Sequence, residues 1–74
     1  MTYTIYGRPG CGYCSMARQL LEINSLPFKY IDIWAEGISK QDLAEKIGQP
    51  VYTVPLILKG EEVIGGFSEL QLTL

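Results

Sequence analysis

The sequence contains no histidine, and its two cysteines stand three positions apart in Cys11-Gly12-Tyr13-Cys14. A structural zinc ion takes four cysteine or histidine ligands. One chain with a single C-x-x-C pair cannot supply that set, so we predict no structural zinc site. The cysteine pair therefore needs another explanation.

Clustered positive charge and long apolar segments are also lacking. Six Lys and Arg stand against eight Asp and Glu, which gives a net charge of -2 and no polybasic run. Proteins that bind nucleic acids depend on clustered cations, so we predict no nucleic-acid partner. The hydrophobic stretches are short, and no basic segment followed by a long apolar one opens the chain. We therefore predict no membrane association and a cytoplasmic location.

The 74 residues, 47% of them hydrophobic, support one modest core. We expect a single domain over residues 1–74, acting as a monomer.

The cysteine pair lies where an alternating apolar strand gives way to a helical pattern. A disulfide between Cys11 and Cys14 would close a loop of about four residues, which restrains the unfolded chain much less than a long cross-link does. Such a bond is suited to opening and closing. If a helix begins at or just after Cys11, the positive end of its dipole favours a thiolate there, with Cys14 one turn inside. Redox chemistry is the leading hypothesis for the pair.

The first half of the chain predicts a βαβ unit. β-Branched and aromatic residues over 2–6 favour a largely buried strand, and alternation over 28–33 favours a second one. The segment between them is long enough for a helix that connects parallel strands. Five residues at helical spacing mark the buried side of that helix: Cys14, Ala17, Leu20, Leu21 and Asn24.

The second half predicts a helix, a hairpin and a last helix. Ser39 is a predicted N-cap, and the helix after it ends at Gly48. Residues 56–58 and 62–64 predict an antiparallel hairpin. Ser68 with Gln71 three residues later matches a capping box and predicts a short helix running nearly to Leu74. The fold class is therefore α/β, in the order β-α-β-α-β-β-α, with a four-stranded mixed sheet flanked by helices.

Three separated motifs carry a resemblance to a known family. They are the C-x-x-C at the start of the first helix, Thr53-Val54-Pro55 before the third strand, and Gly65-Gly66-Phe67 after the fourth. Together with the element order they resemble glutaredoxins, and residues 26–33 and 64–67 are similar to those of short bacterial and bacteriophage dithiol members. The resemblance implies a thioredoxin-like fold.

The resemblance implies that Cys11 is the catalytic attacking thiolate and Cys14 the resolving thiol. It implies that Arg8 stabilises the thiolate or binds a glutathione carboxylate, and that Tyr13 lines the glutathione groove. From the residues alone, Arg8 is also consistent with a solvated turn residue, and Tyr13 with a ring that covers the helix end.

The segment of Thr53, Val54 and Pro55 is the next implied part of the glutathione site. Pro55 resembles the family's cis-proline, which would turn the Val54 backbone toward the cysteines to pair with the cysteinyl part of glutathione. An ordinary trans proline opening an edge strand is the alternative.

The resemblance also implies that Gly66, Phe67 and Ser68 receive the γ-glutamyl end of glutathione. A glycine-rich turn entering a helix offers free N–H donors to a carboxylate. As ordinary structure, Ser68 is a helix N-cap and Phe67 a core residue.

The implied activity is glutathione-dependent reduction of protein disulfides and glutathione mixed disulfides, with ribonucleotide reductase a plausible client by family likeness. One alternative is a redoxin that serves ribonucleotide reductase but is reduced by thioredoxin reductase. Members of that group also have arginine and phenylalanine at the positions of Arg8 and Phe67. A second alternative follows from Gly12, which stands where the best-known dithiol glutaredoxins have proline. Some relatives with glycine or serine there hold a [2Fe-2S] cluster between two subunits, and Cys11 with glutathione would then ligate iron.

Overall fold

The computed structural model describes residues 2–74. Its seven elements follow the predicted order: β1 (Tyr3–Gly7), α1 (Gly12–Ile23), β2 (Phe28–Asp32), α2 (Lys40–Ile47), β3 (Leu56–Lys59), β4 (Glu62–Gly65) and α3 (Phe67–Thr73). The strands lie in the order β2-β1-β3-β4. β1 is parallel to β2 and antiparallel to β3, and β3 is antiparallel to β4. The predicted mixed sheet, with its parallel βαβ unit and its hairpin, is confirmed.

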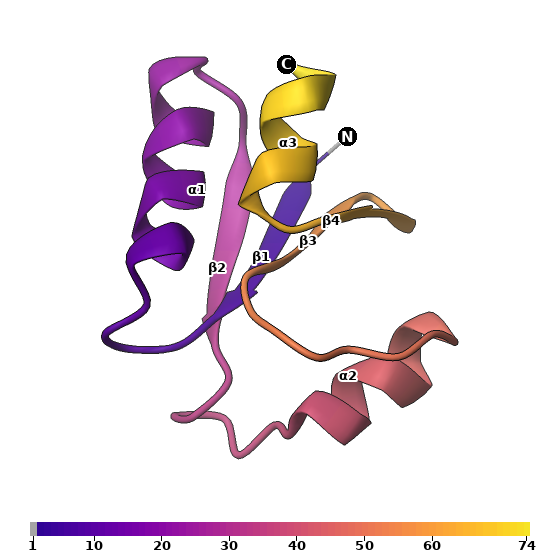
Figure 1. Ribbon diagram of the computed structural model, residues 1–74. Helices are drawn as coiled ribbons and strands as arrows, with labels where there is room; N and C mark the ends of the chain where they lie inside the picture. The colour runs from indigo at the N-terminus through magenta and orange to yellow at the C-terminus, as the bar shows by residue number, and fades with distance from the viewer. Residues whose placement is uncertain (1) are drawn as a thin grey trace.

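The sheet separates two hydrophobic clusters. α1 and α3 lie together on one side of it, and α2 lies apart from them (Figure 1). Ile5 of β1 packs with Leu21 of α1 and Leu70 of α3, whereas the next residue, Tyr6, packs with Leu43 of α2. Successive side chains of a strand point to opposite faces. The apolar sequence of β1 is therefore explained by burial on both faces.

The predicted burial of one side of α1 is confirmed at Cys14, Ala17 and Leu21. The prediction is wrong for Asn24, which is exposed. The helix ends at Ile23, and Asn24 is its exposed C-cap. The Asn24 side-chain amide donates to the carbonyl oxygen of Leu20 at 2.8 Å. Its position at helical spacing reflects this capping contact instead of core packing.

The predicted cap of α2 is confirmed and is reciprocal. The Ser39 hydroxyl accepts the Asp42 backbone N–H at 3.0 Å, and the Asp42 carboxylate accepts the Ser39 backbone N–H at 2.9 Å. At the other end, Gly48 adopts a left-handed conformation with φ of 73°, which glycine tolerates best. Both ends of α2 are therefore fixed by local sequence.

The cap of α2 predicts a pH dependence of stability. The hydrogen bond from the Ser39 backbone, with a second from its side chain, lowers the pKa of Asp42 below its ordinary value of 3.8. A carboxyl with a lower pKa in the folded state stabilises the fold above its unfolded pKa, and this contribution is lost as the pH falls through the folded pKa. We expect the difference in melting temperature between wild type and Asp42→Asn to be small, because the group is exposed, and to shrink below pH 3.8. Thermal unfolding followed by circular dichroism measures it, and a difference independent of pH would contradict the assignment.

The start of α3 differs from the prediction. The helix begins at Phe67 with Gly66 as its N-cap, so the predicted Ser68–Gln71 capping box is wrong. Glu69 is the residue that caps: its carboxylate accepts the Gly66 backbone N–H at 2.8 Å. Glycine has no side chain to return the bond, so only the carboxylate half of a capping box forms.

Three segments meet at one end of the sheet. β1 and β4 are both antiparallel to β3, so they end where β3 begins. The loop after β1 leads to Cys11, the segment before β3 contains Pro55, and the turn after β4 contains Gly66. The first turns of α1 and α3 lie at this same end (Figure 1). Residues far apart in the sequence are thereby placed around the cysteine pair.

Candidate active site

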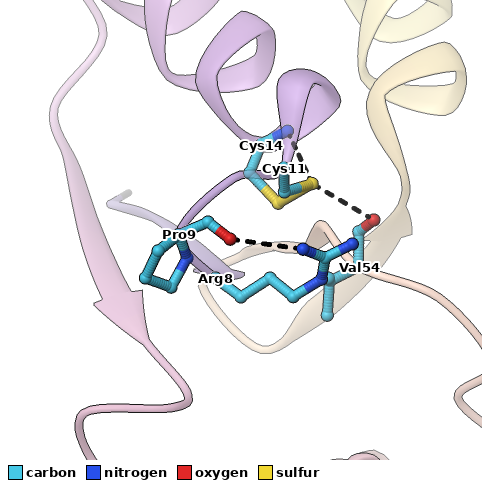
Figure 2. The surroundings of a disulfide bond; sticks show 5 residues. All are labelled: Arg8, Pro9, Cys11, Cys14 and Val54. Carbon is cyan, nitrogen blue, oxygen red and sulfur yellow. Dashed lines mark hydrogen bonds between the residues drawn. A yellow bond between two sulfur atoms is a disulfide. The ribbon is translucent and has the colours of Figure 1, made fainter.

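Cys11 and Cys14 form a disulfide at the start of α1, with their Cα atoms 5.2 Å apart (Figure 2). Cys11 is the N-cap and is half-buried, whereas Cys14 lies inside the helix and is fully buried. The predicted position of Cys14, one turn inside a helix that begins just after Cys11, is confirmed. An incoming thiol or disulfide reaches Cys11 first.

The helix start supplies a hydrogen bond to the Cys11 sulfur. The Cys14 backbone N–H donates to Cys11 Sγ at 3.2 Å. In the reduced protein the same donor, together with the positive end of the helix dipole, favours the thiolate of Cys11. The local geometry thus stabilises negative charge at the accessible sulfur.

The Val54 carbonyl oxygen lies on the other side of the same sulfur, 3.7 Å from Cys11 Sγ (Figure 2). In the disulfide Cys11 carries no proton, so this is a contact; a reduced Cys11 thiol has the proton to make it a hydrogen bond. The Val54–Pro55 peptide bond is cis, as the resemblance implied, and the trans alternative is wrong. The backbone before β3 therefore borders the cysteine pair.

A groove of about 330 Å³ opens beside the disulfide. It is lined by residues from α1, from the segment before β3 and from the start of α3: Tyr13, Thr53, Val54, Pro55, Gly66, Phe67, Ser68 and Glu69. Seven of these eight are among the eight residues that the resemblance implied for glutathione binding; the other implied residue, Arg8, does not line the groove. The structure brings them together in one place, which their positions in the sequence do not reveal.

Two aromatic rings form part of the groove wall. The Tyr13 and Phe67 ring centroids are 6.0 Å apart, with the ring planes tilted by 36°. This separation is within the range of favourable aromatic pairs. Tyr13 is 61% exposed, and Phe67 is half-buried against the core. Phe67 therefore both packs against the core and lines the groove, so the two interpretations of this residue are compatible.

Glu69 is a groove residue that the sequence analysis missed. Its carboxylate already accepts the Gly66 N–H, so the set of free donors expected at residues 66–68 is smaller by one. The signal that could have found it is the carboxylate three residues after a glycine that ends a strand. The groove thus carries a negative charge beside its glycine turn.

Arg8 lies outside the groove. Its guanidinium stands over the Trp34 ring, 5.6 Å from the ring centroid, and donates to the Pro9 carbonyl oxygen at 3.2 Å. Arg8 is half-buried and lies in the loop after β1. The Arg8 side chain passes below the disulfide, with its guanidinium toward Val54 (Figure 2).

Gly7 allows the end of β1 to pack closely against the site. A Cβ atom at Gly7 would stand 3.0 Å from the Cys14 Cβ and closer still to the Tyr30 phenol. Both neighbours belong to the interior of the βαβ unit. Because Gly7 has no side chain, Cys14 can pack directly against the end of β1.

Within residues 2–74, no cluster of three or more Cys, Asp or Glu side chains is arranged to hold a metal ion. The same described part of the chain has no helix long and apolar enough to cross a bilayer.

Comparison with known proteins identifies the family. The glutaredoxin family model matches residues 3–64. Glutaredoxin 1 of Salmonella typhimurium is 45% identical over 96% of this chain and 87% of its own length, and the Haemophilus influenzae glutaredoxin is 43% identical over the same shares.

Solved structures agree with this result. The reduced glutaredoxin of Escherichia coli has a TM-score of 0.85 and 41% identity, over 99% of this chain and 92% of that one. A buckwheat glutaredoxin–glutathione complex shares the fold, with a TM-score of 0.79 and 24% identity over 96% of this chain and 66% of that one. The fold, the C-x-x-C pair at the start of α1 and these likenesses agree: the chain belongs to the glutaredoxins, thiol-disulfide oxidoreductases of thioredoxin-like fold.

Proposed function

We propose that this protein is a glutathione-dependent reductase of glutathione mixed disulfides and protein disulfides, with Cys11 as the nucleophile and Cys14 as the resolving thiol. One observation carries the proposal. The half-buried sulfur of Cys11 is held at a helix start beside a groove, with the buried sulfur of Cys14 within bonding reach behind it.

The first step is attack of the Cys11 thiolate on the glutathione sulfur of a mixed disulfide. A Cys11–glutathione disulfide forms, and the client's sulfur leaves as a thiolate that takes up a proton. A second glutathione thiolate then attacks the glutathione sulfur, which releases oxidised glutathione and restores the Cys11 thiolate. Cys14 is not needed in this cycle.

A protein disulfide requires the second cysteine. Attack by Cys11 joins the client covalently to this protein and frees one client thiolate. The Cys14 thiolate then attacks Cys11 Sγ, which releases the second client thiolate and leaves the Cys11–Cys14 disulfide. Two glutathione molecules reduce that disulfide and become oxidised glutathione.

The groove is the proposed glutathione site. The Val54 backbone, next to Cys11 Sγ, pairs with the cysteinyl part of the peptide as a short antiparallel strand. Thr53 and Pro55 shape this segment, and the Tyr13 and Phe67 rings offer apolar surface along the peptide.

The turn of Gly66 and Ser68 is proposed to receive the γ-glutamyl end. The Glu69 carboxylate beside it is an acceptor for the ammonium group of that end. Arg8 is proposed to act on the thiolate.

The remaining proposals concern the setting of the reaction. Residues 1–74 act as one monomeric domain in the cytoplasm, and the clients are disulfide-containing proteins, ribonucleotide reductase among them. A [2Fe-2S] cluster is the competing use of Cys11; it would take one such sulfur from each of two chains and the other two ligands from glutathione.

Recycling of the wild-type protein tests the proposal. We expect robust turnover of a glutathione mixed disulfide when reduced glutathione and glutathione reductase are supplied. Turnover with thioredoxin reductase alone would instead identify a redoxin. No turnover in either system, together with visible absorbance after anaerobic reconstitution with iron, sulfide and glutathione, would identify a carrier of a [2Fe-2S] cluster.

A further inference from the structure

The loop after β2 is fixed by hydrogen bonds on both sides of Trp34. The Ile33 backbone N–H donates to the Gly7 carbonyl oxygen at 2.9 Å, which extends the pairing of β1 and β2 by one bond. The Asp32 carboxylate accepts the N–H groups of Trp34 and Ala35 at 2.9 and 3.2 Å. Ile33 is buried, which anchors this end of the loop. Trp34 follows Ile33 and Arg8 follows Gly7, so the bond between Ile33 and Gly7 brings Trp34 close to Arg8.

The Trp34 ring is exposed without a core partner. It is 64% exposed and belongs to neither hydrophobic cluster. The Arg8 guanidinium lies over the ring, 5.6 Å from its centroid, within the range of a cation–π interaction. The packing of the core therefore does not explain this tryptophan, the single one in the chain.

The two contacts of Arg8 define where its charge lies. The ring face of Trp34 and the Pro9 carbonyl oxygen hold the guanidinium from two sides. Figure 2 draws the side chain passing below the disulfide, with the guanidinium toward Val54, whose carbonyl oxygen is 3.7 Å from Cys11 Sγ. Without Trp34, a four-bond side chain would be free to turn its charge into water, where it is screened.

We propose that Trp34 is a positioning residue of the active site: it holds the Arg8 guanidinium beside Cys11, where this cation stabilises the thiolate. The inference rests on the proposed role of Cys11 as the nucleophile. Four other ionisable groups lie at this end of the molecule: Asp32 at the end of β2, Glu69 on α3, and the phenols of Tyr13 and Tyr30.

The test uses reduced Cys14→Ser protein, which has Cys11 as its one thiol. The rate of alkylation of Cys11 by iodoacetamide is measured against pH in this parent and in further variants. We expect Trp34→Leu to move the midpoint of the profile to higher pH, with a rate about threefold lower at a fixed pH below the midpoint. Trp34→Phe, which keeps a ring face, should retain most of the rate.

Two controls separate positioning from general disturbance. Tyr52→Leu removes another exposed aromatic ring, 79% exposed against 64% for Trp34, and should leave the profile unchanged. Arg8→Ala should lower the rate at least as much as Trp34→Leu, and adding Trp34→Leu to Arg8→Ala should lower it no further. Circular dichroism of each variant verifies folding.

The outcomes distinguish the two proposals. A Trp34→Leu profile identical to the parent, or an equal further loss in the Arg8→Ala background, would overturn the role of Trp34 and leave that of Cys11 intact. A parent midpoint near that of a free thiol, about 8.5, would show that the thiolate is not stabilised and would also overturn the role of Trp34, whereas the role of Cys11 as the nucleophile is tested separately by the turnover of Cys11→Ser.

Discussion

We expect Cys11→Ser to abolish the reduction of a glutathione mixed disulfide and Cys14→Ser to keep the rate within about threefold of wild type. The expected loss for Cys11→Ser is at least about a thousandfold, because a serine hydroxyl does not ionise near neutral pH and cannot replace a thiolate nucleophile. Cys14 is buried behind Cys11 and, in the proposed cycle, takes no part when free glutathione resolves the intermediate. Spectrophotometric turnover coupled to glutathione reductase measures both variants.

A protein disulfide supplies the matched comparison. With that substrate Cys14→Ser should also lose most of its activity, since the Cys11–client intermediate then lacks its internal resolving thiol. Retention of activity by Cys11→Ser on either substrate would contradict the assignment of the nucleophile. Equal losses in both variants on the mixed disulfide would contradict the proposed division of roles.

We expect Leu70→Ala to destabilise the fold by about 2–5 kcal/mol, the usual cost of deleting a large buried side chain. Leu70 is completely buried and joins α3 to the cluster that contains Ile5 and Leu21. Total stabilities of small domains are only about 5–15 kcal/mol, so this loss is a large fraction. Chemical unfolding followed by circular dichroism gives the free energy of unfolding.

Leu72→Ala is the matched control, because it makes the same chemical change on the same helix. Leu72 is 86% exposed. We therefore expect the free energy of unfolding of the Leu72→Ala variant to stay within about 0.5 kcal/mol of wild type. α3 also carries Phe67 and Glu69 of the groove wall, so Leu70→Ala should raise the KM for glutathione as well. Equal effects of the two substitutions would contradict the packing of α3 described here.

The order of strands and helices could be predicted because it depends on local patterns. β-Branched runs, helical spacing and the Ser39 cap each act over a few residues, and each element is found within one or two residues of its predicted bounds. The start of α3 could not be predicted in the same way. Its N-cap is a glycine, and the cap comes from the side chain of Glu69, so the hydroxyl pattern at Ser68 was misleading.

The prediction of the site residues depended on the resemblance to glutaredoxins more than on helix and strand periodicity. Helix and strand patterns do not reveal that Thr53 and Gly66 line the groove together with Tyr13. That convergence follows from the strand order β2-β1-β3-β4, which local sequence does not determine. The contact of Trp34 with Arg8 was missed for the same reason, because it joins the ends of two neighbouring parallel strands.

The most direct test of Cys11 as the nucleophile of a glutathione-dependent reductase is to identify the covalent intermediate in Cys14→Ser protein. The reduced variant is incubated with oxidised glutathione, and intact and peptide mass spectrometry locate the product. We expect one glutathione per chain, attached at Cys11 and removed by excess reduced glutathione. A protein that stays unmodified while it remains folded would contradict the claim that Cys11 is the nucleophile of a glutathione-dependent reductase.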